Sequence, residues 1–168
     1  MEKSQIKISI RNLVELVLRS GDIDNRLVSS SRMLEGTRIH QKIQKESGEK
    51  YSKEVSLSFD YEIEGFVIKL EGRADGIISE SEGIVIDEIK STSRPLEHID
   101  DAFSLLHWAQ VNCYAYIYAM QNDLQEICAQ LTYFQIDTEE IKSIRKVFKL
   151  TELQVFMSEL LNKYLVWG

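Results

Sequence analysis

Residues 72–76 read GRADG and residues 86–90 read IDEIK, and these two stretches decide how the rest of the chain is interpreted. Both are expected on neighbouring β-strands. Side chains alternate along a strand, so Glu88 and Lys90 project on the same side. Burying a carboxylate costs free energy unless it is paired or binds a metal. We therefore expect a divalent cation held by Asp75 and Glu88, with Lys90 beside the water that is to be activated.

The chain has 168 residues, 43% of them hydrophobic, which is typical of one globular domain. No apolar run approaches the ~18 residues that a membrane span needs, and residues 1–5 lack the apolar core of a signal peptide. Cys113 and Cys128 are isolated thiols that fit a reducing compartment. They are too few for an iron–sulfur cluster or a four-thiolate zinc site. We expect a cytoplasmic protein without a membrane partner.

The net charge of −7 argues against a non-specific nucleic-acid binder. The charge is unevenly distributed: residues 1–53 carry 11 Lys/Arg against 7 Asp/Glu (+4), and residues 54–168 carry 9 against 20 (−11). A metal site needs carboxylates, and bound cations offset their charge when a substrate arrives. We expect weak unassisted DNA binding, which a basic partner domain would strengthen.

The hydrophobic pattern predicts a mixed sheet with helices on both faces. Glycine-containing turns are expected at 62–65 and 80–83, and Gly72 and Gly76 indicate a bulge or bend beside Asp75. A short strand or loop is expected to lead into a helix within residues 6–20. The other predicted helices are 32–46, 99–122 and 151–165, and the predicted strands are 54–61, 66–78, 84–90, 126–136 and 141–150.

Three further side chains draw attention. His40 lies at the edge of the apolar face of the helix at 32–46, and Gln110 and Tyr114 project together from the helix at 99–122. Each has a structural explanation when taken singly. A histidine in such a position is most often packed or partly solvated, and Gln110 with Tyr114 fits helix-surface packing. Glu88 and Lys90 would also form an exposed ion pair worth ~0–1 kcal/mol.

Two charged features have mainly structural interpretations. Asp87 is expected to face away from Glu88 on the same strand and to support the structure. The basic residues between 142 and 149 are expected to form a solvated strand edge that blunts aggregation. A DNA contact by this basic edge is the less favoured alternative.

Taken together, four motifs resemble the PD-(D/E)XK nuclease superfamily. The similarity is closest to the RecB-type exonuclease group, which includes the nuclease domains of RecB and AddB and the RecB-like exonucleases associated with CRISPR systems. It implies an α/β fold, with a restriction-endonuclease-like mixed β-sheet core flanked by helices in the order α-βββ-α-β. The motifs are Gly36-x-x-x-His40, Gly72-Arg73-x-Asp75-Gly76, Asp87-Glu88-Ile89-Lys90 and Gln110-x-x-x-Tyr114.

The resemblance implies three sets of site residues. Lys90 would orient or help to deprotonate the water and steady the charge of the phosphate. Gln110 and Tyr114 would contact the DNA strand and brace the site. The implied catalytic residues are Asp75, Glu88 and Lys90. The implied metal ligands are His40, Asp75, Glu88 and the main-chain carbonyl of Ile89. The implied nucleic-acid contacts are Gln110, Tyr114 and Arg73.

The chain departs from the family pattern at two points. Ala74 stands where the superfamily name has a proline, a common variation in the group. The cysteines that bind an iron–sulfur cluster in many RecB-like members are missing, so we predict no cluster. Carboxylate ligands suit Mg²⁺ or Mn²⁺, and an imidazole ligand favours Mn²⁺. We expect one or two such ions.

These features predict a metal-dependent DNA nuclease that hydrolyses phosphodiester bonds in recombination or repair, with an exonuclease favoured. Two alternatives remain open: an inactive nuclease-fold module that binds nucleic acid or a partner protein, and a hydrolase of smaller phosphate esters. No motif reports the polarity of digestion, the preferred strandedness of DNA, the choice between exonuclease and endonuclease, or the choice between Mg²⁺ and Mn²⁺.

We expect residues 1–168 to form a single nuclease domain. The apolar ending at residues 165–168 would favour burial, which suggests a domain excised from a longer helicase–nuclease chain. The N-terminal nuclease domain of a DinG-like helicase is one such arrangement, and a helicase that is linked or associated is the expected partner. The sequence contains no Gly-x-x-x-x-Gly-Lys-Ser/Thr phosphate loop, so this segment has no ATPase motif of its own.

Overall fold

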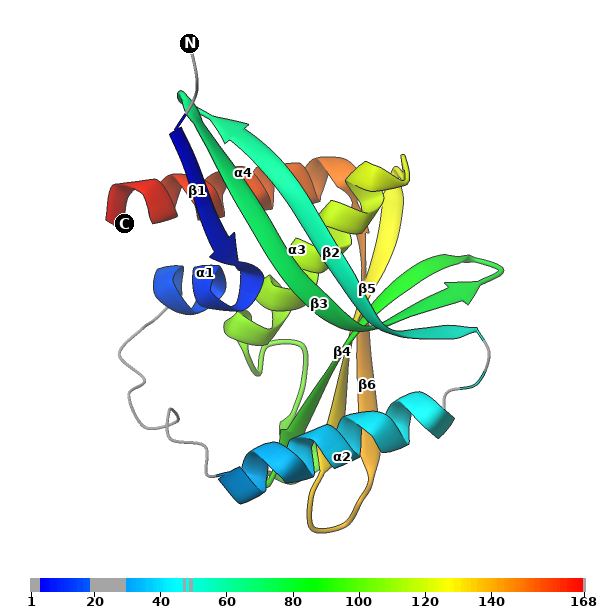
Figure 1. The fold of residues 1–168 in the computed structure, drawn as a ribbon. Coiled ribbons are helices and arrows are strands. Elements are labelled where there is room, and N and C mark those ends of the chain that lie inside the picture. Colours follow the sequence, from blue (N-terminus) through cyan, green and yellow to red (C-terminus); the bar gives the residue numbers. More distant parts are fainter. Residues whose placement is uncertain (1–3, 19–29, 47, 49, 168) are drawn as a thin grey trace.

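The computed structural model describes residues 4–18, 30–46, 48 and 50–167 (Figure 1). This description leaves out the side chains of residues 30–37 and Trp167, and all of Gly168. The expected burial of the chain end therefore lies outside the described residues. The elements in order are β1 (Ser4–Ser9), α1 (Ile10–Val17), α2 (Ser30–Glu46), β2 (Tyr51–Ile63), β3 (Phe66–Glu80), β4 (Gly83–Thr92), the 3₁₀ turn η1 (Leu96–His98), α3 (Leu105–Gln121), β5 (Glu126–Gln135), β6 (Ile141–Lys149) and α4 (Leu150–Trp167).

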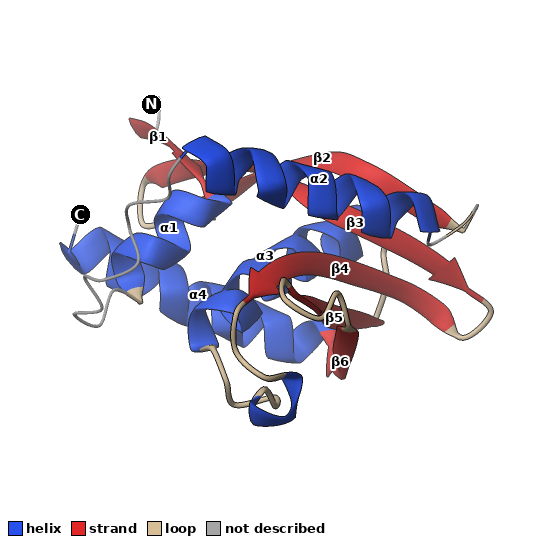
Figure 2. Cartoon of the chain, turned by 90° about the horizontal axis from the view of Figure 1, so that it is seen from below, coloured by secondary structure: helices blue, strands red, loops and turns tan. Residues whose placement is uncertain are grey.

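The six strands of the described residues form one mixed sheet in the order β1-β3-β4-β5-β6, with β2 paired to β3. β1 is parallel to β3 and β4 is parallel to β5, whereas the other neighbours are antiparallel. Helix α2 lies on one side of the sheet, and α1, α3 and α4 lie on the other (Figure 2). The predicted α/β class and the mixed sheet flanked by helices are therefore confirmed.

The hydrophobic contacts on the two sides of the sheet differ in extent. The main core joins α1, α3 and α4 to the sheet. On the other side, Ile39 and Ile43 of α2 pack on Ile89 and Phe134 of β4 and β5. This small cluster fixes α2, and with it His40, over the middle of the sheet. None of the described helices is long and apolar enough to cross a membrane.

The hairpin between β2 and β3 turns at Glu64 and Gly65, whose φ angles are 42° and 83°. Positive φ at both central positions is the type I′ geometry that suits the twist of a hairpin, and glycine adopts it at little cost. The turn sets the register, so residue 54 lies opposite residue 75. Neither residue takes part in the ladder, although Lys53 pairs with Gly76 and Val55 pairs with Ala74.

β3 changes its partner strand near residue 75, where its pairing with β2 is interrupted. Its residues 66–71 pair with β1, and its residues 76–80 pair with β4. β4 leaves β3 after the Gly76–Asp87 pair and continues along β5 to Thr92. From their common hairpin, β3 runs to the upper part of Figure 1 and β4 to the lower part. Asp75 therefore lies at a fork in the sheet.

Gly72 and Gly76 give space to two aromatic rings. A Cβ atom at Gly72 would lie 2.6 Å from Cε1 of Tyr114, and one at Gly76 would lie 1.9 Å from Cζ of Tyr51. The register of β2 with β3 is the same on both sides of Asp75, so the bulge suggested by these glycines is not present as an inserted residue. The glycines are needed for close approach of the rings.

The long helix begins later than its sequence pattern predicted. α3 starts at Leu105, not near residue 99, because Ser104 has extended backbone angles and its hydroxyl accepts a hydrogen bond from the His107 N–H at 3.1 Å. This is a standard N-cap. The preceding segment packs back on α3, where the Trp108 indole N–H donates to the Asp101 carbonyl at 2.8 Å.

The contact between Gly76 and Tyr51 leads to a stability prediction. Gly76→Ala should lower the free energy of unfolding by about 2–4 kcal/mol, because the new methyl group displaces a ring whose hydroxyl is bonded to buried Asp87 at 2.7 Å. Urea denaturation measures the change. The matched control is Ser79→Ala, an exposed position on the same strand, which should shift stability by less than about 0.5 kcal/mol. Equal stability of the two variants would contradict the packing argument.

Candidate active site

Asp75 joins three elements at the fork between β3 and β4. Its side chain is 10% exposed. Its Oδ2 accepts the Ile89 N–H of β4 at 2.7 Å, and its Oδ1 lies 3.3 Å from Nδ1 of His40 on α2. The main-chain N–H of Ile89 thus bonds to a side chain at the point where the β3–β4 ladder has ended. Asp75 takes over the connection between the diverging strands.

His40 and Asp75 share their surroundings with Glu54 of β2. One ligand atom from each of these three residues lies within 4.8 Å of the other two. Glu54 has a φ angle of 52°, which is uncommon for a residue with a side chain. Gln44 donates to Glu54 Oε1 and to the main-chain carbonyl of Asp75, both at 2.8 Å. Gln44 therefore holds Glu54 beside Asp75.

Glu88 approaches Asp75 from β4. The two carboxyl groups are hydrogen-bonded, and Glu88 is 3% exposed. Burial raises the pKa of Glu88 well above its usual range, with Lys90 acting against the shift and Asp75 adding to it. Burial also raises the pKa of Asp75, but hydrogen bonds from Glu88, His40 and the Ile89 N–H outweigh it and lower that pKa to about 2. The proton of the pair therefore resides on Glu88.

One oxygen of this pair lacks a partner. Glu88 Oε2 is buried and has no hydrogen-bond partner among the residues that the structure describes. A buried acceptor in this condition costs about 1–3 kcal/mol. Such a cost is relieved when a cation replaces the proton, because carboxylate oxygens are ligands for hard divalent ions. Asp75, His40 and Glu54, whose ligand atoms lie within 4.8 Å of one another, therefore fit a divalent metal, with Glu88 bonded to Asp75 beside them.

Lys90 connects the carboxylates to α3. Its Nζ donates to Oε1 of Gln110 at 2.8 Å. Gln110 is also bonded to Tyr114 one turn further along the helix, and the Tyr114 ring is buried over Gly72. Burial, followed by the charge of Glu88, raises the pKa of Tyr114. Lys90 is consequently oriented from α3 towards the acidic residues.

The structure places every residue of the expected site around this fork. His40, Asp75 and Glu88 come together, and Ile89 touches Asp75 through its N–H group. Lys90, Gln110 and Tyr114 form a chain beside them. Arg73 lies at the rim with a 65% exposed side chain, and its Nε is 3.1 Å from Oε2 of Glu54.

The sequence interpretation missed Glu54 and Gln44. The signal for Glu54 was present, because counting outward from the turn at Glu64 and Gly65 places it opposite Asp75. Gln44 follows His40 by four residues, so both side chains lie on the same face of α2. Their convergence depends on how α2 crosses the sheet, which no local pattern reports.

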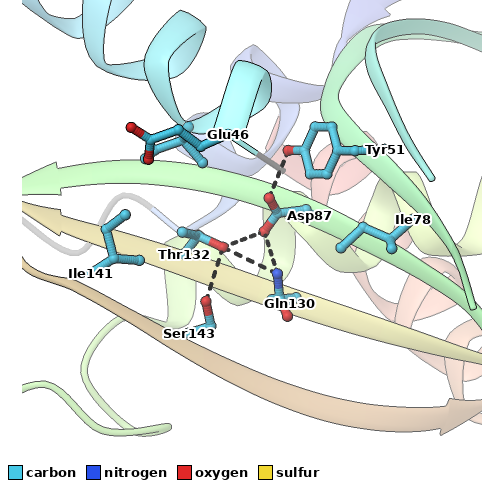
Figure 3. Close-up of a pocket in the computed structure, with 9 residues that line it drawn as sticks. Glu46, Tyr51, Ile78, Asp87, Gln130, Thr132, Ile141 and Ser143 are labelled. Carbon is cyan, nitrogen blue, oxygen red and sulfur yellow. Dashed lines mark hydrogen bonds between the residues drawn. The ribbon is translucent and has the colours of Figure 1, made fainter. Parts of the chain in front are cut away.

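Asp87 faces a different part of the molecule from Glu88. Its Oδ2 accepts from the Tyr51 hydroxyl at 2.7 Å (Figure 3). Its Oδ1 accepts from Gln130 at 3.1 Å and from the Thr132 hydroxyl at 2.5 Å. These groups line a pocket together with Ser143 and residues of α2. Asp87 is thus fully hydrogen-bonded on the side of the sheet that α2 covers, which fits its expected structural role.

Comparisons with known proteins agree with this architecture. A sequence model of the family described as the PD-(D/E)XK nuclease superfamily matches residues 9–165. The crystal structure of SSO0001 superposes with a TM-score of 0.59 at 19% identity, covering 96% of this chain and 77% of that one. At this identity the likeness shows a shared fold.

Two exonuclease structures are more distant. An alkaline exonuclease from Laribacter hongkongensis has a TM-score of 0.49 at 14% identity, covering 94% of this chain and 89% of that one. A phage-related exonuclease from Haemophilus somnus 129PT has a TM-score of 0.48 at 14% identity, covering 92% and 76%. A comparison with curated proteins gave no match.

The cluster around Asp75 leads to a metal-binding prediction. His40→Ala and Glu54→Gln should each weaken Mn²⁺ binding at least about tenfold, because each removes one donor of the cluster. Isothermal titration calorimetry measures the affinity without any catalytic turnover. Asp60→Asn is the matched control, since it neutralises an exposed carboxylate on the strand that carries Glu54. If Glu54→Gln bound Mn²⁺ as tightly as Asp60→Asn, Glu54 would not be a ligand.

The pKa shift of Glu88 leads to a pH-dependent prediction. A carboxyl group whose folded-state pKa is raised contributes stability below its ordinary pKa, and this contribution is lost as the pH rises towards the raised value. In EDTA, Glu88→Gln should therefore be more stable than the wild-type protein at pH 8, by about 1–3 kcal/mol, and the difference should shrink at pH 5. Urea denaturation at the two pH values measures it.

The control is Glu97→Gln, which neutralises an 80% exposed carboxylate. It should leave stability almost unchanged at both pH values. A difference between Glu88→Gln and the wild-type protein that is the same at pH 5 and pH 8 would show that Glu88 does not titrate in this range.

Proposed function

The chain belongs to the PD-(D/E)XK nuclease superfamily, and we propose that it is a divalent-metal-dependent deoxyribonuclease. The observation that carries the proposal is the meeting of His40, Asp75 and Glu88 at the sheet fork, with Lys90 alongside. These residues come from three elements and are far apart in sequence. Packing alone does not require a buried acid pair with an orphan oxygen.

Asp75 and Glu88 are the proposed principal metal ligands, with His40, Glu54 and the main-chain carbonyl of Ile89 as further donors. Mg²⁺ or Mn²⁺, as one or two ions, would neutralise phosphate charge and increase the acidity of a bound water. The histidine favours Mn²⁺. Glu88 must release its proton for the cation to bind, so binding is coupled to pH.

Lys90, Gln110 and Tyr114 act on the substrate side of the acid pair in this proposal. Gln110 fixes the Lys90 ammonium group, which then orients the attacking water and stabilises negative charge on the phosphate. Tyr114 braces Gln110 from its buried position over Gly72. Arg73 is exposed at the rim and would bind the DNA backbone, in exchange for its contact with Glu54.

We also propose the finer assignment to the RecB-type group. The Gly36-x-x-x-His40 and Gln110-x-x-x-Tyr114 motifs support it, and the contact of His40 with Asp75 is consistent with it. This assignment favours an exonuclease in DNA recombination or repair, formed as one domain of a longer helicase–nuclease chain such as a DinG-like protein. A helicase would supply the DNA affinity that the net charge of −7 opposes.

The activity test uses end-labelled linear DNA, circular DNA and a small ester, bis(p-nitrophenyl) phosphate, each with Mg²⁺ or Mn²⁺. Degradation of linear DNA alone supports an exonuclease. Asp75→Ala should lower the rate by at least about 10³-fold, and Lys90→Met by about 10²-fold, because these groups stabilise charge at the reacting phosphate. Asp60→Asn is the control with an exposed carboxylate and should keep full activity.

Three outcomes would count against the proposal. A folded protein that binds Mn²⁺ but leaves all DNA intact would indicate an inactive nuclease-fold module. Faster cleavage of the small ester than of DNA would indicate a phosphoesterase for small substrates. An unchanged rate in Asp75→Ala would remove the assigned site.

A further inference from the structure

An aromatic cluster adjoins Lys90 on the side away from Asp75. It consists of Phe103, His107 and Tyr133. The Phe103 and Tyr133 rings meet edge to face with centroids 5.7 Å apart, and the His107 and Tyr133 centroids are also 5.7 Å apart. Nδ1 of His107 lies 2.9 Å from the Tyr133 hydroxyl. Tyr133 is the register partner of Lys90 in the β4–β5 ladder, so the cluster lies directly beside one of the proposed catalytic residues.

Helix α3 connects the cluster to the same site. His107 precedes Gln110 by three residues, so the two side chains lie on one side of α3, about 4.5 Å apart along its axis. Gln110 in turn binds Lys90. Burial, followed by the charge of Lys90, lowers the pKa of His107 to about 3. His107 is therefore a neutral ring at ordinary pH.

Core packing explains Tyr133, which is buried, and the inner side of Phe103, which packs against the main core, but it does not explain the neighbouring Leu105. Leu105 at the start of α3 is 78% exposed. Phe103 is only partly buried, and the Arg94 guanidinium lies 5.6 Å from the centroid of its ring. An exposed cation thus lies against a partly buried ring, and an exposed leucine follows that ring by two residues in the chain, near the proposed hydrolytic site.

This combination has the chemistry of a nucleobase-binding surface. Aromatic rings and apolar side chains stack on unpaired bases, and arginine binds the adjoining phosphates. Paired bases within a duplex have no free face to offer. We propose that Arg94, Phe103 and Leu105 form a binding site for the unpaired bases of single-stranded DNA, next to Lys90. This inference rests on the proposed nuclease function and adds the strandedness of the substrate.

The site leads the DNA strand towards the acid pair. A base stacked on Phe103 and Leu105 places its phosphate near Arg94, and the next part of the strand lies towards Lys90 and Gln110. The overall negative charge disfavours DNA binding through phosphates alone, so stacking supplies affinity that does not depend on a basic surface.

The test measures equilibrium binding in EDTA, where no hydrolysis occurs. Fluorescence anisotropy follows a labelled oligothymidylate, the same oligonucleotide with abasic positions, and a blunt duplex of equal length. Phe103→Leu keeps apolar volume but removes the ring, and Leu105→Gln changes an exposed position, so both variants should fold. Each should weaken oligothymidylate binding about tenfold. Leu16→Gln, at a 48% exposed leucine on α1, is the matched control and should bind as the wild-type protein does.

The outcomes separate the two proposals. Tenfold weaker binding in both site variants, together with weaker binding of the abasic oligonucleotide by the wild-type protein, supports the site. Equal binding by the site variants and Leu16→Gln overturns it, as does an equal loss of duplex and single-strand binding. Because no cleavage is involved, a protein that binds as expected but never cuts DNA would disprove the nuclease activity and leave the base-binding site intact.

Discussion

The structure depends on the way a single carboxylate, Asp75, replaces a missing stretch of β-ladder. Its neighbours across both edges, Glu54 and Glu88, lie opposite it in register but are not paired through their main chains. The side chain compensates by accepting the Ile89 N–H and by contacting His40 and Glu88. Burial of an acid is costly unless it is satisfied in this way. The same contacts that satisfy Asp75 bring the other proposed ligands within reach.

A second polar network, centred on Asp87, stabilises the strands next to the fork. Asp87 forms the last β3–β4 pair with Gly76 and is bonded to Tyr51 on β2 and to Gln130 on β5. Gln130 accepts from Arg145 of β6 at 2.6 Å, and Arg145 makes two bonds of 2.9 Å to Glu80. The network therefore reaches from β2 across β4 and β5 to β6 and returns to the end of β3. Fully satisfied networks of this kind fix one arrangement of the strands, so Asp75 and Glu88 hold their positions without direct main-chain pairing.

The sequence predicts those features that local periodicity controls. Alternation located β2 to β6, and the expected side of Asp87 follows from the period of a strand. The predicted start of α3 was wrong because the Ser104 hydroxyl accepts a hydrogen bond from the His107 N–H and caps the helix there. The preceding loop therefore extends to residue 104. Glu54 was missed because alternation treats it as an ordinary strand residue, whereas its φ of 52° removes it from the ladder. His40 required the resemblance, since nothing in the helix itself shows which part of the sheet α2 crosses.

The acidity of the chain has a physical explanation in this arrangement. Without a cation, the acid pair is held by one proton on Glu88, and Lys90 is held by Gln110. A cation that enters must displace that proton, so metal affinity rises with pH until Glu88 is ionised. A bound metal would add to the positive charge that Lys90 and Arg73 offer to a phosphate, in a part of the chain (residues 54–168) that carries 20 acidic against 9 basic side chains. DNA and metal should therefore bind cooperatively, with the ion supplying the local charge that the protein surface lacks.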